Sequence, residues 1–315
     1  MRSWFICITV GCCLAVHAAE LKPVATVHLS CESPSQMVSP NGGQLAVRCK
    51  DHTLHLVDVA NGHEQYVFSA AVGVSSYAYS RDGRWFAAGT KEGWVEIVPT
   101  SGSASPKRWR ADDRRIDTVQ FLADGDSLLV AGADKPGAVW DVREAPKLRA
   151  SLHSDFAGLT ACALSPDGKL LATADGDTVL RIYDTATWKI VREYRGIKLE
   201  TFAVPFTGDG KYLLAGGADD HISVLEVSSG TEVRKLGGQA GYVGEILPLG
   251  DNRRAAVVYL DNNGLKPPRP MMWNLETLKA EPLTSERPLT GGGLVRGKLW
   301  VVSAAGSSLQ AWEYE

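Results

Sequence analysis

The sequence predicts an all-β fold: a seven-bladed β-propeller of four-stranded antiparallel sheets. Three observations lead to this prediction. A segment of 41 to 43 residues recurs along the chain. Each copy alternates apolar and variable positions, as β-strands do. The two ends of the chain supply complementary parts of one sheet.

The repeat is clearest in SPDGKLLATADGDTVLRIYD (Ser165–Asp184). Four other stretches align with it without gaps: Ser39–Asp58, Ser80–Pro99, Leu122–Asp141 and Thr207–Glu226. Two looser copies begin at Leu249 and Val295, which brings the number of copies to seven. A period of this length, made of short runs split by Gly/Asp turns, is typical of sheets repeated around a ring.

The columns of the alignment predict the strands. One apolar column holds Leu45, Phe86, Leu128, Leu171 and Leu213, and another holds Leu56, Ile97, Val139, Ile182 and Val224. A mixed column lies between flanking apolar columns of the later run and holds His55, Glu96, Ala138, Arg181 and Ser223. The pattern has the two-residue period of a β-strand.

Each copy is therefore expected to form four strands, a to d. In the fourth copy we expect these at Leu159–Ser165, Lys169–Ala174, Val179–Asp184 and Lys189–Arg195. The Asn-Gly and Asp-Gly pairs supply the positive-φ residues of the tight turns. One such sheet has two faces to cover, and closing seven sheets into a ring covers both faces of each.

The two ends of the chain are expected to complete one blade. The chain stops at LQAWEYE, the third strand of the seventh copy, which therefore lacks an outer strand. Before the first copy lies Pro23–Leu29, a strand without a sheet of its own. We expect this N-terminal strand to become the outer strand of the last blade.

Residues 1–18 are expected to be a secretory signal peptide, and 19–315 the propeller. Arg2 is followed by an uncharged apolar stretch and by small residues, with cleavage expected after Ala18. This predicts export to a bacterial periplasm or to the extracellular space. A lipid anchor at Cys12 is an alternative, although Thr9 stands where a large aliphatic residue is usual. A buried N-terminal strand is another.

Composition narrows the possible partners. The chain has 315 residues, of which 44% are hydrophobic, and a formal charge of −3. The charge argues against a nucleic-acid partner, because such domains are usually basic. No interior apolar run is long enough to span a bilayer, so no transmembrane span is expected.

Three cysteines follow the expected cleavage site. Cys31 and Cys49 lie around one expected strand pair, where a disulfide between them would leave Cys162 free. The alternative is that all three are small buried apolar residues. No CxxC motif and no Cys/His spacing indicates a zinc site.

The sequence carries no catalytic, cofactor or metal motif. HExxH, G-x-S-x-G, Walker and dinucleotide patterns are all absent. The acidic turns Asp124-Gly-Asp126, Asp175-Gly-Asp177 and Asp219-Asp220 lack the alternating oxygens and terminal glutamate of a calcium loop, and they are interpreted as turns. We therefore expect no catalytic residue, no cofactor and no metal.

Non-repeating loops are the expected place for a binding site, because recognition residues often lie on loops held by a rigid scaffold. Lys107–Arg115, interpreted as a d–a connection, combines a tryptophan with both charge signs, and Asp261–Pro270 is a proline-stiffened insertion in the b–c turn of the sixth blade. Two further d–a loops carry aromatic residues. The candidate partner-binding residues are Arg108, Trp109, Arg114, Arg115, Phe156, Tyr242, Lys266 and Arg269. The alternative is that these segments are solvated connections and packing residues.

The repeats resemble those of the WD40 family, through Ser165–Asp175, Val139–Val142 and Ile182–Asp184. The Gly-His pair usual before strand a is missing, so the hydrogen-bonded tetrad of many members is expected to be incomplete. The resemblance implies a propeller that serves as a non-enzymatic platform for a protein or peptide partner. Two other functions stay open: an enzyme with its site in the central channel, and a structural module of a cell-envelope complex.

Overall fold

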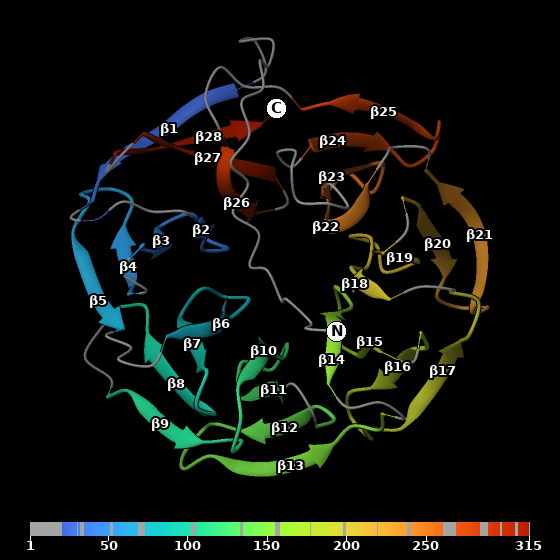
Figure 1. Ribbon diagram of the computed structural model, residues 1–315, viewed down its shortest axis with the longest axis horizontal. Helices are drawn as coiled ribbons and strands as arrows, with labels where there is room; N and C mark the ends of the chain where they lie inside the picture. The colour runs from blue at the N-terminus through green and yellow to red at the C-terminus, as the bar shows by residue number, and fades with distance from the viewer. Residues whose placement is uncertain are drawn as a thin grey trace.

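The computed structural model is a closed ring of seven four-stranded antiparallel blades around a central axis, and the first and last blades join in one eight-stranded sheet (Figure 1). It describes residues 21–29, 31, 35–50, 53–68, 73–101, 105–132, 135–154, 158–176, 178–197, 200–218, 220–237, 241–260, 269–283, 289–296, 298–305 and 308–314. The expected signal peptide, its cleavage site and Cys12 lie outside these ranges. No helix within them has the length and apolar character of a membrane span.

The first four blades follow the chain in order from the inner strand to the outer one. Blade 1 contains β2 (Ser35–Val38), β3 (Gln44–Arg48), β4 (Leu54–Asp58) and β5 (Glu64–Phe68). Blade 2 contains β6 (Val74–Tyr79), β7 (Trp85–Thr90), β8 (Trp94–Pro99) and β9 (Lys107–Arg110). Blade 3 contains β10 (Ile116–Phe121), β11 (Ser127–Gly132), β12 (Ala138–Asp141) and β13 (Lys147–Ser151). Blade 4 contains β14 (Leu159–Leu164), β15 (Leu170–Asp175), β16 (Leu180–Asp184) and β17 (Ile190–Tyr194).

The remaining blades complete the ring. Blade 5 contains β18 (Thr201–Ala203), β19 (Tyr212–Gly217), β20 (Ile222–Glu226) and β21 (Thr231–Leu236). Blade 6 contains β22 (Tyr242–Pro248), β23 (Arg254–Leu260), β24 (Arg269–Asn274) and β25 (Lys279–Pro282). Blade 7 contains β26 (Leu289–Val295), β27 (Lys298–Ala305), β28 (Ser308–Tyr314) and β1 (Leu21–His28). The predicted seven-bladed all-β fold is confirmed.

The N-terminal strand closes the ring, as predicted. β1 pairs antiparallel with β28 from Leu21 opposite Tyr314 to His28 opposite Ser308. A second contact joins the two blades at the axis, where the inner strands β2 and β26 pair in parallel. The run Gly291-Gly292-Gly293 has no side chains there, and a Cβ at Gly293 would lie 3.4 Å from the carbonyl oxygen of Val38. Small residues thus allow the first and last blades to meet closely.

The a–b turns recur as the alignment predicts. In blade 4 the N–H of Gly168 donates to the carbonyl oxygen of Ser165 at 2.9 Å, and the Ser165 hydroxyl donates to Asp167. Gly168 has a φ of 73°, which an L side chain rarely adopts. Blades 2 and 5 repeat this hydrogen-bonded turn at Ser80 and Thr207.

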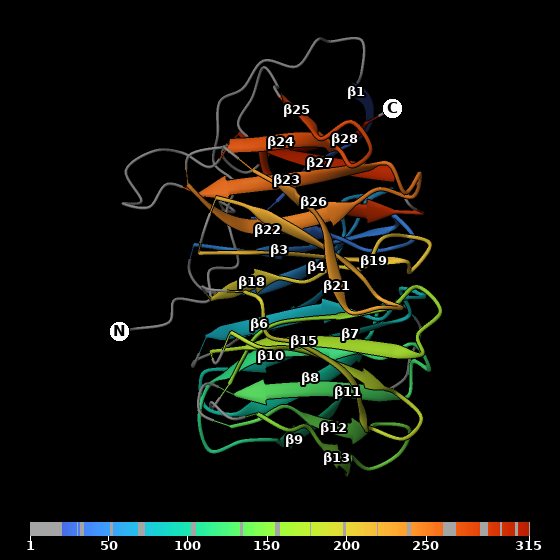
Figure 2. The ribbon, with the colours of Figure 1, turned by 90° about the vertical axis from the view of Figure 1, so that its right-hand side faces the viewer.

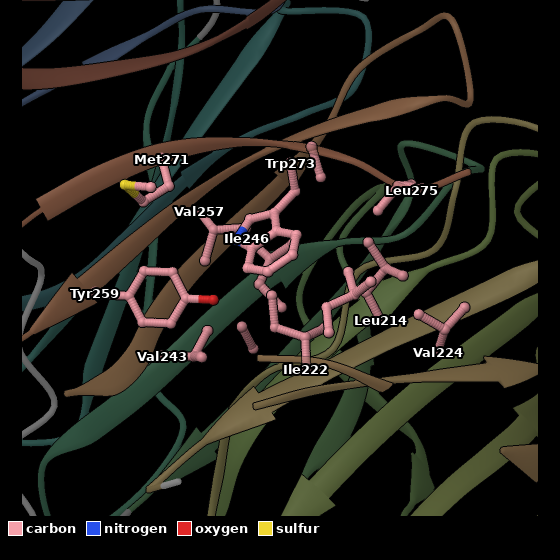
Figure 3. Close-up of a cluster of buried hydrophobic side chains, with 13 residues drawn as sticks. Leu214, Ile222, Val224, Val243, Ile246, Val257, Tyr259, Met271, Trp273 and Leu275 are labelled. Carbon is pink, nitrogen blue, oxygen red and sulfur yellow. The ribbon is translucent and has the colours of Figure 1, made fainter. Parts of the chain in front are cut away.

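Adjacent blades pack face to face through apolar side chains. Between blades 5 and 6, Leu214 and Ile222 meet Val243, Val257 and other buried residues (Figure 3). Each blade has a neighbouring blade on each of its two faces. In an inner or middle strand, side chains on both faces are therefore buried, and all six residues of β11 are buried. The strands cross the thickness of the ring between its two faces (Figure 2).

Candidate functional site

The two faces of the ring carry different connections. The loop face is the one on which strand d leads to strand a of the next blade and strand b leads to strand c. The turn face carries the a–b and c–d turns. The candidate residues were expected on the loop face, and the structure places them in several different environments.

Trp109 lies in a strand, which corrects the prediction that Lys107–Arg115 is entirely a loop. Lys107–Arg110 form β9, the outer strand of blade 2, in which Lys107 and Trp109 are half-buried and Arg108 and Arg110 are exposed. The Trp109 ring packs against Trp140 of blade 3, with 5.9 Å between ring centroids. Trp109 is therefore a packing residue between two blades. The sequence Lys-Arg-Trp-Arg, in which every second residue is an arginine, has the two-residue period of a β-strand and could have predicted this strand.

Trp109→Ala is expected to lower the free energy of unfolding by about 2–3 kcal/mol, somewhat less than a fully buried tryptophan would. The neighbouring exposed change Arg110→Ala is the control and should shift it by less than about 0.5 kcal/mol. Urea unfolding followed by circular dichroism measures both. Equal effects of the two changes would contradict the assignment of Trp109 to the interblade core.

The segment after β9 is a loop, as predicted, and it is fixed tightly to the scaffold. The backbone N–H groups of Ala111 and Asp112 donate to the carbonyl oxygen of Gly93, at 2.9 and 3.2 Å. A Cβ at Gly93 would lie 2.1 Å from the Asp112 carbonyl oxygen, so only glycine permits this approach. The loop is therefore rigidly positioned on the b–c turn of blade 2.

Ion pairs hold the same loop from its other side. Lys135 reaches Asp112 at 2.9 Å and Asp113 at 2.6 Å. The hydrogen bond from Lys135 is the main reason that the pKa of Asp113 lies below its ordinary value, and the pKa of Lys135 is raised in turn. Arg115 pairs with the buried Asp117 at 2.5 Å.

Arg108 and Arg114 are the candidate cations that the surface presents most openly. The Arg108 guanidinium lies over the Trp94 ring, 4.8 Å from its centroid. Arg108 is also opposite Glu96, whose carboxylate accepts a 2.7 Å hydrogen bond from Tyr66. Burial, with this hydrogen bond, raises the pKa of Tyr66 to about 12. Polar contacts thus join the outer parts of blades 1 and 2 beside Arg108.

The other candidates do not join this surface within the described residues. Tyr242 begins β22 and packs against Phe202, with 5.9 Å between centroids, so it is a packing residue. Phe156 and Lys266 lie outside the described residues. Arg269 begins β24, where its backbone is opposite Tyr259. The segment Asp261–Pro270, interpreted as a b–c turn with an insertion, therefore ends in a strand at Arg269 and Pro270.

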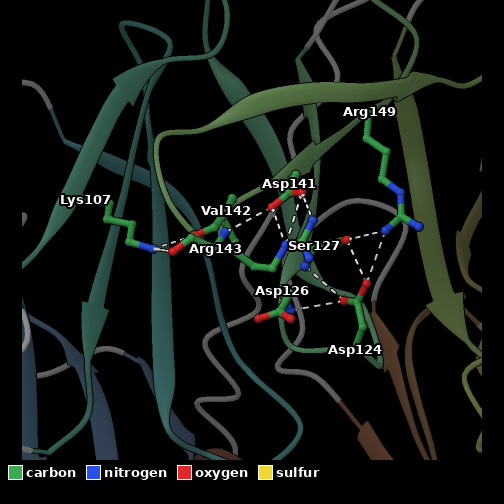
Figure 4. Close-up of polar contacts among 8 residues, drawn as sticks. All are labelled: Lys107, Asp124, Asp126, Ser127, Asp141, Val142, Arg143 and Arg149. Carbon is green, nitrogen blue, oxygen red and sulfur yellow. Dashed lines mark hydrogen bonds and ion pairs between the residues drawn. The ribbon is translucent and has the colours of Figure 1, made fainter.

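Sequence reasoning missed a depression of about 480 Å³ on the turn face of blade 3. It is lined by Asp124, Asp126, Ser127, Asp141, Arg143, Lys147, Leu148 and Arg149. Figure 4 shows the polar contacts of Asp124, Asp126, Ser127, Asp141, Arg143 and Arg149. Asp124 accepts hydrogen bonds from the backbone N–H groups of Asp126 and Ser127, as a turn residue does. Two nitrogens of Arg143 donate hydrogen bonds to the carboxylate of Asp141, and this hydrogen bonding lowers the pKa of Asp141 to about 2. Arg149 pairs with Asp124 at 3.3 Å, so two of the aspartates that line the depression are already paired with arginines.

Asp175 is buried, although the sequence suggested a simple bend at this position. It ends β15 and is 2% exposed. Its carboxylate accepts from Arg181 Nη1 at 2.9 Å and from the Ser154 hydroxyl at 2.5 Å. Arg181 is 1% exposed, and its Nε lies 3.4 Å from Glu193. An ion pair therefore lies within blade 4, and Asp177 lies outside the described residues.

Cys31 and Cys49 form a disulfide in the structure, with 5.9 Å between their Cα atoms. Cys31 follows the ring-closing strand and Cys49 follows β3, so the bond ties the closing segment to blade 1. Cys162 is a free thiol on the inner strand β14, and burial raises its pKa to about 12.

An enzyme with its site in the central channel would need ionisable side chains that converge from several inner strands. In the described strands β2, β6, β10, β14, β18, β22 and β26, the carboxylates are Asp117 and Glu245. They belong to blades 3 and 6, and Asp117 is paired with Arg115. Surrounding protein raises the pKa of Glu245. These described inner strands bring no acid–base pair together.

Comparisons with known proteins agree with the fold. The family profile described as WD40, "WD domain, G-beta repeat", matches residues 147–184. This match runs from the first residue of β13 to the last residue of β16, so it covers strand d of one blade and strands a to c of the next.

The chain is also similar to "Protein groucho" of Drosophila melanogaster, with 27% identity over 139 residues. The match covers 44% of this chain and 18% of that protein, so the chain corresponds to only a small part of its relative. With seven four-stranded blades and a closing N-terminal strand, the chain is a seven-bladed β-propeller in which residues 147–184 match the WD40 repeat in register with the blades.

Proposed function

We propose that this protein is a non-enzymatic scaffold that binds a protein or peptide partner through the loop face of blades 2 and 3. WD40 propellers typically serve as protein-interaction scaffolds. The observation that carries the proposal is the loop Ala111–Arg115, which the Gly93 carbonyl and Lys135 fix in place. A preformed loop loses little conformational entropy on binding.

The surface beside this loop suits a partner with polar and acidic groups. Arg108 and Arg114 are exposed, and arginine is common among the residues that dominate binding energy at interfaces. The large exposed apolar residues within the described ranges are Val24, Leu148, Val191, Val233 and Leu278. They lie in different blades around the ring, which does not favour the broad apolar face of a structural envelope module.

We further propose that the protein is exported through residues 1–18 and works in the periplasm or outside the cell. The disulfide between Cys31 and Cys49 supports this location, because such bonds persist mainly in oxidising compartments. Fractionation of the native organism, with the mass of the mature N-terminus, tests it.

The double change Arg108→Ala/Arg114→Ala is expected to reduce partner recovery at least tenfold in crosslinking and affinity purification from the native organism, because it removes the exposed cations. The control, Lys169→Ala/Lys211→Ala, removes the same charge from the turn face, where the two side chains are 80% and 73% exposed. Thermal unfolding verifies both folds. Equal recovery from the two variants would contradict the assigned face.

A further inference from the structure

Three metal-ligand side chains converge beside the ring closure, although their spacing in the sequence shows no zinc motif. The ligand atoms of Cys31, Cys49 and His55 all lie within 4.8 Å of one another. Cys31 comes from the segment between β1 and β2, Cys49 follows β3, and His55 lies on β4. The fold therefore assembles the cluster from three separate segments.

The strand register explains why the cluster forms. His55 is opposite Val47, and the N–H of Cys49 donates to the carbonyl oxygen of Thr53, so Cys49 and His55 lie on the same face of blade 1. Cys49 packs in the core shared with blade 7, and Cys31 packs at its edge. The cluster thus lies where blade 1 meets the ring-closing blade.

His55 has an unusual environment for a buried side chain. Its side chain is 9% exposed, and its Nδ1 atom is buried without a hydrogen bond. This nitrogen lies 3.3 Å from Oε2 of Glu64, and Nε2 lies 2.6 Å from the Thr53 hydroxyl. A carboxylate beside one ring nitrogen is the arrangement that orients histidine ligands in metal sites.

We propose that Cys31, Cys49 and His55 bind zinc when their disulfide is reduced, so that this site alternates between a disulfide state and a metal-bound state. In tetrahedral zinc sites, sulfur and nitrogen ligands lie about 3.6–3.8 Å apart. The ligand atoms here lie within 4.8 Å of one another, close to this range. The half-buried Cys31 provides access from solvent, and Glu64 orients His55.

The chemistry is balanced by a dithiol reductant. It transfers two electrons to the sulfur–sulfur bond, becomes a cyclic disulfide and leaves two protein thiols. Zinc then displaces the two thiol protons into solvent and binds two thiolates and the neutral imidazole, with water in the fourth position. In the reverse direction a small-molecule disulfide oxidant accepts two electrons from the two thiolates and two protons from solvent and becomes a dithiol, while the protein disulfide re-forms and the metal is released.

The test uses the full chain and Co²⁺ as a spectroscopic probe of the zinc site. Protein reduced with a phosphine is expected to bind one Co²⁺ per chain, with thiolate-to-cobalt charge-transfer absorption and tetrahedral visible bands, and Zn²⁺ should displace the cobalt. Protein kept in the disulfide form should show neither signal. Zn²⁺ should also raise the melting temperature of the reduced protein only.

Single substitutions test each proposed ligand, and substitution of the third cysteine serves as the control. Cys31→Ser and Cys49→Ser should lose the thiolate absorption, His55→Gln should weaken Co²⁺ binding at least tenfold, and Glu64→Gln should weaken it about tenfold. Cys162→Ser is the matched control and should bind like the wild type. Circular dichroism establishes that each reduced protein is folded.

Several results would overturn the proposal. Equal cobalt binding by the reduced and disulfide forms would do so, as would unchanged binding by His55→Gln or by both serine variants at positions 31 and 49. Reduced wild-type protein that unfolds or binds no cobalt would also overturn it. Because the reduced wild type carries no substitution, a variant that fails to fold does not weaken the test.

Discussion

Replacing Arg181 with methionine is expected to lower the free energy of unfolding by about 3–5 kcal/mol, because the change leaves the Asp175 carboxylate buried without its cation. Both side chains are at most 2% exposed, and 2.9 Å separates Arg181 Nη1 from Asp175 Oδ2. The Ser154 hydroxyl still donates to Asp175, but a neutral hydroxyl does not replace the charge of the guanidinium. Urea unfolding at neutral pH measures the effect.

Two comparisons make this expectation specific. The pair of Arg143 and Asp141 is in equally close contact, with 2.6 Å between Nη2 and Oδ2, but its side chains are 64% and 29% exposed, so Arg143→Met should cost less than about 1 kcal/mol. The double change Arg181→Met/Asp175→Leu removes both charges and should be less destabilising than Arg181→Met alone. A single variant as stable as the wild type would show that the Asp175 charge is not buried in solution.

The mixed column of the alignment shows what the sequence could and could not predict. It contains His55, Glu96, Ala138, Arg181 and Ser223, and its variability suggested no particular role. In the structure Arg181 is 1% exposed and His55 is 7% exposed. Both faces of a blade are covered by neighbours, so a polar residue at an alternate position need not face solvent. The role of such a polar residue depends on the side chains that it contacts in the fold, and the alignment of the repeats does not show those contacts.

The candidate binding segment failed in part for a related reason. The charged neighbours of Trp109 suggested a loop, whereas they are the exposed residues of an edge strand whose other residues face the core. A disulfide between Cys31 and Cys49 was one of two interpretations of the sequence, because the two cysteines flank one strand pair, and the structure contains it. The nearness of His55 to them was not, because it depends on the register between β3 and β4.

The turns and the ring closure were predictable because they depend on local chemistry and on counting. Glycines after Asn or Asp mark the a–b turns at Gly42, Gly83 and three equivalent positions, all with positive φ. The unpaired strand at the N-terminus matched the missing strand of the last blade. Both inferences use residues that have the same role in every copy.

The closing strand offers the second large effect. Val27→Asp is expected to lower the free energy of unfolding by about 3–5 kcal/mol, because it places an unpaired carboxylate in the core between blades 7 and 1. Val27 is 2% exposed and contacts this core beside Leu309, its partner on β28. The change acts on the one sheet built from both ends of the chain, so it opposes closure of the whole ring.

Val24→Asp on the same strand is the matched control. Val24 is 40% exposed and lies at the irregularity between Pro23 and Ala25, where the pairing with β28 shifts. The same new charge should therefore cost less than about 0.5 kcal/mol. Urea unfolding gives both values, and limited proteolysis should cleave the Val27 variant faster near its N-terminus. If the two variants unfolded alike, β1 would not stabilise the ring through its buried side chains, and closure would have to rest on the parallel pairing of β2 with β26.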